Sequence, residues 1–155
     1  VINTDAEGRV VLSDAIEYAN RLKVDEMVDL ATLTGACMVA LGNYTAGLFS
    51  NNIKLKDKLL KASLMSGEKM WQLPLDEELR SSIDSQIADV KNSASTRYGG
   101  ATTAAMFLEF FVDKKIPWSH IDIAGPAYIE KDRGWCAPGS TGFAVRSLIN
   151  YLNLS

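Results

Sequence analysis

Two acidic side chains and an arginine stand close together near the beginning of the sequence. Asp5 and Glu7 are two residues apart, Gly8 follows, and Arg9 comes next. In an extended segment such carboxylates point to one side, roughly 6.5 to 7 Å apart, and a bend at Gly8 could turn Arg9 over the same pocket. Carboxylates suit Mg²⁺, Mn²⁺ or Zn²⁺, and a guanidinium can hold an anion nearby. The pattern indicates a metal or oxyanion site, although most short runs of this kind are solvated turns.

Alternating helices and strands are expected to position this turn. Residues 1–3 read as the end of a buried strand that delivers it, and three further strands are expected at 27–31, 45–50 and 118–123, with an extended segment at 71–75. Helices are expected from Ser13 to about 21–23 and at 36–41, 52–66, 76–87, 101–112 and 143–152. This alternation predicts an α/β sheet covered by helices on both faces.

Apolar stripes predict which side of the helices faces the core. In the first helix the stripe consists of Leu12, Ala15, Ile16, Ala19 and Leu22. In the helix that Asn52 is expected to cap, the inward residues are Leu55, Leu59, Leu60 and Leu64, and five lysines between 54 and 69 are expected to form a solvated face.

Three expected strands end in segments rich in small or polar residues. Asn3 leads into Asp5 and Glu7, residue 31 leads into the turn 32–35, and residue 123 leads into the turn 124–127. In open α/β sheets, ligands gather where loops leave the carboxyl ends of strands. A metal turn beside two turns that expose backbone would form a pocket for a peptide.

Composition limits the classes of function. The net charge of -3 gives no basic surface for nucleic acid or an anionic membrane, and no apolar run approaches the ~18 residues that span a bilayer. Cys37 and Cys136 are far apart and are expected to be reduced thiols, so the cytoplasm is the expected compartment. The sequence opens on an apolar run without an initiator Met, which predicts a chain entered in mid-domain.

Several other residues admit two interpretations. His120, the one histidine, is expected to be hydrogen-bonded structure, and the alternative is a metal pair with Asp122. Trp71 and Trp118 are expected to be core or interface aromatics. Residues 89–92 could line a channel or form a solvated helix end, and the polar stretch 91–100 could line a channel or connect elements.

Five motifs follow the opening one in order. The opening motif is NTDAEGR at 3–9, and the others are DLATLTGA at 29–36, WQLPL at 71–75, GG at 99–100, WSHIDIAGP at 118–126 and TGF at 141–143. The string resembles the leucyl aminopeptidases of peptidase family M17 over essentially the whole chain. The resemblance implies the carboxy-terminal portion of the catalytic domain, residues 1–155, with a central mixed sheet, and an enzyme that releases apolar N-terminal residues from peptides.

The resemblance also implies roles for particular residues. Asp5 and Glu7 match two metal ligands of a pair of divalent ions, Zn²⁺ or Mn²⁺, and Arg9 matches the arginine that holds a bicarbonate as general base. Positions that match the substrate-binding residues are Thr32, Leu33, Gly35, Ala124 and Ala127. Family members form hexamers, so a homohexamer is implied.

Some family ligands have no counterpart in this chain. The remaining metal ligands, a lysine and two aspartates, and a second catalytic lysine belong to motifs upstream of NTDAEGR, so the chain is expected to carry half a site. The alternative is therefore a non-catalytic module that serves assembly or another interaction such as DNA binding. Its weakness is the intact turn of Asp5, Glu7 and Arg9, which a scaffold does not need.

Overall fold

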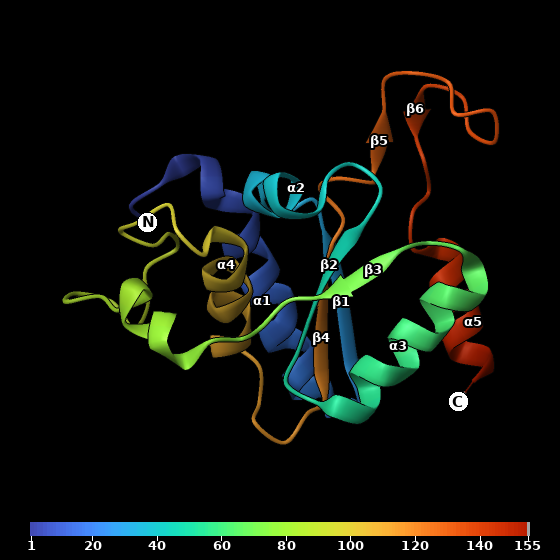
Figure 1. Cartoon of the computed structure of the whole chain (residues 1–155). Helices are drawn as coiled ribbons and strands as arrows, with labels where there is room; N and C mark the ends of the chain where they lie inside the picture. The colour runs from blue at the N-terminus through green and yellow to red at the C-terminus, as the bar shows by residue number, and fades with distance from the viewer. Residues whose placement is uncertain (155) are drawn as a thin grey trace.

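A mixed four-stranded sheet separates two layers of helices in the computed structural model, which describes residues 1–154 (Figure 1). The strand order is β1-β4-β2-β3. The pairs β1/β4 and β2/β3 are parallel, whereas β2 and β4 are antiparallel. This arrangement confirms the predicted fold class, a central mixed sheet with helices on both faces.

The elements alternate along the chain as the sequence predicts. Short 3-10 helices are η1 (Thr4–Ala6) and η2 (Glu77–Ile83), and the α-helices are α1 (Glu7–Leu22), α2 (Gly35–Leu41), α3 (Ile53–Ser66), α4 (Gly100–Phe110) and α5 (Val145–Asn153). The strands of the main sheet are β1 (Met27–Ala31), β2 (Ala46–Ser50), β3 (Met70–Gln72) and β4 (Trp118–Asp122), and a projecting hairpin contains β5 (Tyr128–Ile129) and β6 (Gly139–Ser140). No helix within residues 1–154 is both long and apolar enough to cross a membrane.

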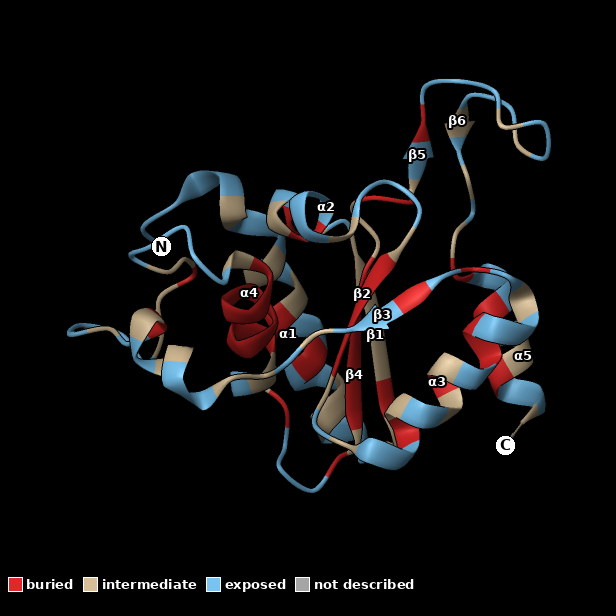
Figure 2. Ribbon diagram, viewed as in Figure 1, coloured by how far each residue is buried: buried red, intermediate tan, exposed pale blue. Residues whose placement is uncertain are grey.

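Each face of the sheet has its own apolar core. Ile121 of β4 packs in a cluster with residues of α3 and α5, whereas Trp118 of the same strand packs with residues of α1 and α4. Side chains alternate across a strand, so a continuous buried strand of this kind contributes to both layers. Figure 2 shows the result: β4 is buried along its length, and α4 is buried over 101–108.

Local sequence signals account for the ends of α3. Asn52 Oδ1 accepts a hydrogen bond from the Leu55 N–H at 3.0 Å, and Gly67 ends the helix in the left-handed conformation, with φ 71°. The predicted bounds are thus confirmed. The predicted inward position of Leu64 is wrong, because its side chain is 83% exposed while Leu59 is fully buried.

The first helix begins six residues earlier than expected. Ser13 is buried inside α1 and donates its hydroxyl to the Val10 carbonyl at 2.6 Å, so it satisfies a helical carbonyl instead of capping a new helix. Ala15 and Leu22, assigned to the apolar stripe, are exposed.

Residues 1–3 form no strand in the described chain, contrary to the prediction. Val1 and Ile2 are exposed, and no strand runs beside them to pair with their backbone groups. Of the helix expected at 76–87, only the short 3-10 helix η2 over Glu77–Ile83 is formed. Of the two tryptophans discussed above, Trp118 is fully buried and Trp71 lies exposed on the edge strand β3.

The glycine inside β2 has a packing cause. A Cβ at Gly47 would lie 2.7 Å from Cys37 Sγ, which is closer than real side-chain contacts. The glycine therefore makes room for α2 to lie on the sheet. Cys37 is buried, Cys136 is partly buried, and both are free thiols, as predicted.

Two leucines of α3 provide a matched test of this packing. Leu59→Ala should lower the free energy of unfolding by about 2–5 kcal/mol because it leaves a cavity in the core between α3 and the sheet. Leu64→Ala on the exposed side should change it by less than about 0.5 kcal/mol. Urea denaturation of both variants measures the difference, and equal effects would contradict the assigned orientation of α3.

Candidate functional site

Residues from two separate motifs line one cleft of about 400 Å³. Asp5, Glu7 and Arg9 come from η1 and the start of α1, and Thr32 and Leu33 come from the loop after β1. The structure therefore brings together the turn predicted to bind metal and the first part of the loop predicted to bind substrate. Apolar side chains such as Val11 and Leu12 complete the walls.

The turn that carries the two carboxylates is helical, not extended as the sequence analysis assumed. Asp5 lies in η1 and Glu7 opens α1, while Asn3 Oδ1 accepts a hydrogen bond from the Asp5 N–H at 2.9 Å. Gly8 lies within α1 and makes no bend. Glu7 occupies the first turn of the helix, where a negative charge is favoured. Both carboxylates are exposed and line the cleft, so their oxygens are accessible to a ligand.

Arg9 reaches back across the chain from the same helix. Its Nη1 donates to the Asn92 carbonyl at 2.9 Å, and among residues 1–154 its buried Nε has no hydrogen-bond partner. Burial lowers the pKa of Arg9 from its usual value, and the negative charge of Asp122 partly opposes that shift. A partly desolvated guanidinium with an unused donor is a suitable group for binding a small anion.

The donor set fits part of a divalent metal site. Exposed carboxylates at one turn are the ligands that Mn²⁺ accepts and Zn²⁺ also uses. Within the described residues no three His, Cys, Asp or Glu side chains gather as a metal cluster. Two carboxylates are too few ligands for two divalent ions, so Asp5 and Glu7 would need further ligands from outside residues 1–154.

The buried carboxylate of Asp122 ties together two loops at the carboxyl edge of the sheet. Its Oδ1 accepts hydrogen bonds from the N–H groups of Leu33 at 3.1 Å, Thr34 at 3.4 Å and Ala124 at 3.1 Å. Its Oδ2 accepts from Thr34 Oγ1 at 2.7 Å. Because β1 and β4 are parallel and Ala31 is paired with Asp122, both loops leave the sheet at the same edge. One carboxylate thus fixes the backbone of both loops.

The role of Asp122 was missed by sequence reasoning, which considered it as a metal partner of His120. That alternative is wrong, because His120 Nδ1 instead contacts Asp29 Oδ1 at 2.5 Å, and Asp29 Oδ2 accepts from Trp118 Nε1 at 2.6 Å. His120 belongs to β4, a central strand of the sheet, and is fully buried, so the structural interpretation is correct. The available signal for Asp122 was a carboxylate at the last residue of a buried strand, where it can accept N–H groups of the following turn.

The other predicted substrate-binding residues lie at the same edge but outside the lining of this cleft. Gly35 opens α2 and is exposed, with open space where a side chain would stand. Ala124 and Ala127 lie in the turn after β4, with Gly125 between them. A Cβ added at Gly125 would lie only 2.3 Å from the Gly42 carbonyl oxygen. This contact requires glycine and holds the turn against the end of α2.

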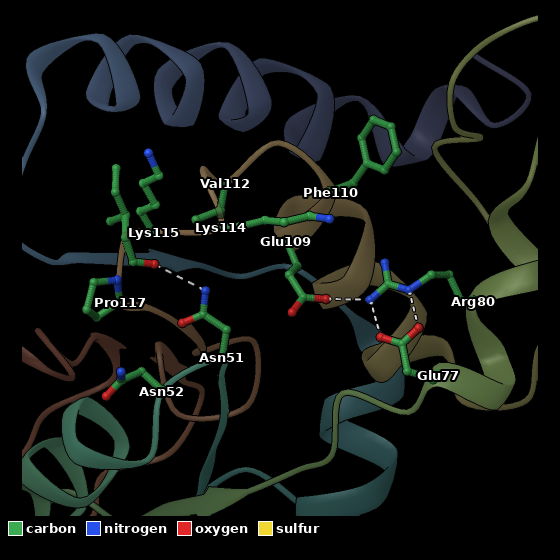
Figure 3. A pocket seen from close by; sticks show the side chains of 11 residues that line it. Asn51, Asn52, Glu77, Arg80, Glu109, Phe110, Val112, Lys114, Lys115 and Pro117 are labelled. Atoms are coloured by element: carbon green, nitrogen blue, oxygen red, sulfur yellow. Dashed lines mark hydrogen bonds and ion pairs between the residues drawn. The ribbon is translucent and has the colours of Figure 1, made fainter.

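A second cleft, of about 650 Å³, shares no residue with the first (Figure 3). In it Arg80 donates to Glu77 and to Glu109, with distances of 2.6 to 2.7 Å. Asn51 Nδ2 donates to the Ile116 carbonyl at 3.2 Å. The bonds of Arg80 join η2 to α4, and the bond of Asn51 joins the end of β2 to the segment before β4. We therefore assign the cleft a structural role.

Replacing Asp122 tests the tie between the two loops. Asp122→Asn should lower the free energy of unfolding by about 1.5–3 kcal/mol, because charge-assisted hydrogen bonds to four donors are weakened in a buried site. Asp25→Asn, at an exposed position, is the matched control and should change it by less than about 0.5 kcal/mol. Urea denaturation measures both. An Asp122→Asn variant as stable as the control would show that the carboxylate does not fix the loops.

Comparison with known proteins gives one consistent result. The family model for the catalytic domain of the cytosol aminopeptidase family, Peptidase M17, matches residues 1–149. Proteins named "Probable cytosol aminopeptidase" from Persephonella marina and Aquifex aeolicus are 56% and 54% identical over 150 and 151 residues, each covering 97% of this chain. The chain spans only 30% of the length of each of these two relatives.

Solved structures agree with the sequence comparison. A mutant of tomato leucine aminopeptidase superposes with a TM-score of 0.93 at 42% identity. The match covers 100% of this chain and 30% of the tomato chain. The bottromycin maturation enzyme BotP has the same TM-score at 44% identity, and the match covers 97% of this chain and 34% of the BotP chain. The cleft of Asp5, Glu7 and Arg9 therefore lies in a chain that belongs to the catalytic domain of the cytosol aminopeptidase family, M17.

Proposed function

We propose that this chain forms the carboxy-terminal part of the catalytic domain of a metal-dependent aminopeptidase that releases apolar N-terminal residues from peptides. The observation that carries the proposal is the shared cleft, in which Asp5, Glu7 and Arg9 face Thr32 and Leu33. Exposed carboxylates, a partly desolvated guanidinium and the backbone of a loop are the groups that metal-assisted peptide hydrolysis needs. Membership of the M17 family gives the reaction class.

Two divalent ions, Zn²⁺ or Mn²⁺, are the proposed cofactors, together with bicarbonate. When bound, the metal pair supplies Lewis-acid polarisation of the scissile carbonyl and an acidified water, and bicarbonate supplies a general base. Asp5 and Glu7 would contribute two of the metal ligands. Arg9, which lines the cleft, would orient the anion while its Nη1 stays bonded to the Asn92 carbonyl.

The loops tied by Asp122 are the proposed peptide-binding elements. Leu33 and Gly35 would contact the substrate backbone, and the open space beside Gly35 allows a peptide to approach its N–H. Thr32, Ala124 and Ala127 would form the wall of the pocket for the N-terminal side chain. Small residues in the turn 124–127 favour an apolar side chain of moderate size, because they leave room without adding buried charge.

The complete protein is proposed to act as a cytoplasmic homohexamer on peptide substrates. Family membership is the support for assembly and compartment. The net charge of -3 offers no electrostatic support for a nucleic-acid partner.

Glu7 provides the direct test of the proposed chemistry. In the full-length protein, Glu7→Gln should lower kcat for Mn²⁺-dependent hydrolysis of leucine p-nitroanilide at least about 100-fold, since even residues that only support metal ligands contribute 10- to 100-fold. Glu17→Gln, at an exposed position on the same helix, is the matched control and should keep the activity of the unmodified protein. Initial rates and circular dichroism are measured for each variant.

An unchanged rate in a folded Glu7→Gln variant would overturn the proposal. If the unmodified full-length protein has no metal-dependent activity at all, the alternative of a non-catalytic assembly or interaction module is favoured.

A further inference from the structure

A buried asparagine far along the chain holds the turn that carries the carboxylates. Asn92 lies in the loop between η2 and α4 and is 2% exposed. Its Nδ2 donates to the carbonyls of Asn3 at 2.7 Å and Ala6 at 3.2 Å, and its Oδ1 accepts from the Ile2 N–H at 2.9 Å. Both donors and the acceptor of this one side chain are therefore spent on the backbone on either side of Asp5.

The backbone of the same residue holds Arg9. The Asn92 carbonyl accepts from Arg9 Nη1 at 2.9 Å. In the part of the chain that the structure describes, the buried Nε of Arg9 has no hydrogen-bond partner. A single loop residue thus fixes both the turn of Asp5 and Glu7 and the guanidinium beside it. The expectation that residues 89–92 form a solvated helix end is wrong for Asn92.

The turn lies at the surface of the described chain. Residues 1–5 are exposed, and none of the residues of η1 is buried. The Asn3 side chain bonds within the turn, to the Asp5 N–H, so it shapes the turn without attaching it to the rest of the fold. The amide of Asn92, which bonds to the backbone of Ile2, Asn3 and Ala6, attaches the turn to the loop before α4.

The chemistry of the contact requires an amide. Asn supplies two N–H donors and one acceptor without charge. An aspartate at position 92 would lose both donors and place its charge against the carbonyl oxygens of Asn3 and Ala6, which is unfavourable in a buried site. An alanine would leave the three backbone groups without their partner.

We propose that Asn92 is a positioning residue, which holds Asp5, Glu7 and Arg9 in the geometry that binds the metal ions and the anion. The inference rests on the function proposed above. Metal ligands held in place before the ion arrives bind it more tightly, and groups that orient such ligands typically contribute 10- to 100-fold to affinity or rate.

The test compares Asn92 with another asparagine that tethers α1. Asn20 Nδ2 donates to the Phe111 carbonyl at 2.7 Å and to Glu17 Oε2 at 3.2 Å, and Asn20 Oδ1 accepts from the Asp113 N–H at 3.2 Å. None of these partners lies in residues 2–9. Asn92→Asp and Asn20→Asp are introduced into the full-length protein, with Asn92→Ala as the variant that adds no charge. Mn²⁺ affinity by calorimetry, kcat, KM and hydrogen exchange of the amides of residues 2–9 are measured.

We expect both Asn92 variants to weaken Mn²⁺ binding and to lower kcat by about 10- to 100-fold, with KM changed much less, and to speed exchange over residues 2–9. Asn20→Asp should leave all four quantities near those of the unmodified protein. Mn²⁺ affinity, kcat and exchange that are unchanged in a folded Asn92→Ala variant would overturn the inference while leaving the proposed function standing. An unmodified protein that neither binds Mn²⁺ nor hydrolyses the anilide would instead overturn the proposed function.

Discussion

The structure of the site depends on one buried carboxylate at the end of β4. Asp122 accepts hydrogen bonds from the loop after β1 and from its own turn, so the two loops at this edge of the sheet have a common anchor. Its negative charge also acts on Arg9, whose pKa burial lowers. A desolvated carboxylate is costly unless its hydrogen bonds are complete, which explains why four donors converge on it and why the loops are ordered together.

A second, independent attachment holds the opposite wall of the cleft. Asn92 fixes the exposed turn of residues 2–6 and the Arg9 side chain, and it does so from a loop that precedes α4. The turn proposed to bind metal and the loops proposed to bind peptide are therefore positioned by different residues on different elements. This separation predicts that affinity for metal and affinity for peptide can change independently on mutation.

The fold and the site differ in how well the sequence predicts them. Helices with clear start and stop residues, such as α3 between Asn52 and Gly67, are predicted to within a residue. The start of α1 was placed too late because Ser13 looks like a cap, whereas in the structure it bonds to the Val10 carbonyl inside the helix. Long-range contacts leave no local pattern, so neither the tether from Asn92 nor the bonds of Asp122 to Leu33 and Thr34 could be read from spacing. The resemblance to M17 picked out Asp5, Glu7, Arg9, Thr32 and Leu33, which the structure brings into one cleft; their roles remain predictions.

The most direct test of the central claim is the position of bound metal in the full-length protein. Crystals soaked with Mn²⁺ are measured near the manganese absorption edge, so that anomalous scattering locates the ions. The account predicts two peaks about 3.5–4 Å apart, with Asp5 and Glu7 among the coordinating side chains. Anomalous peaks only at other sites, with neither carboxylate within coordination distance, would contradict it.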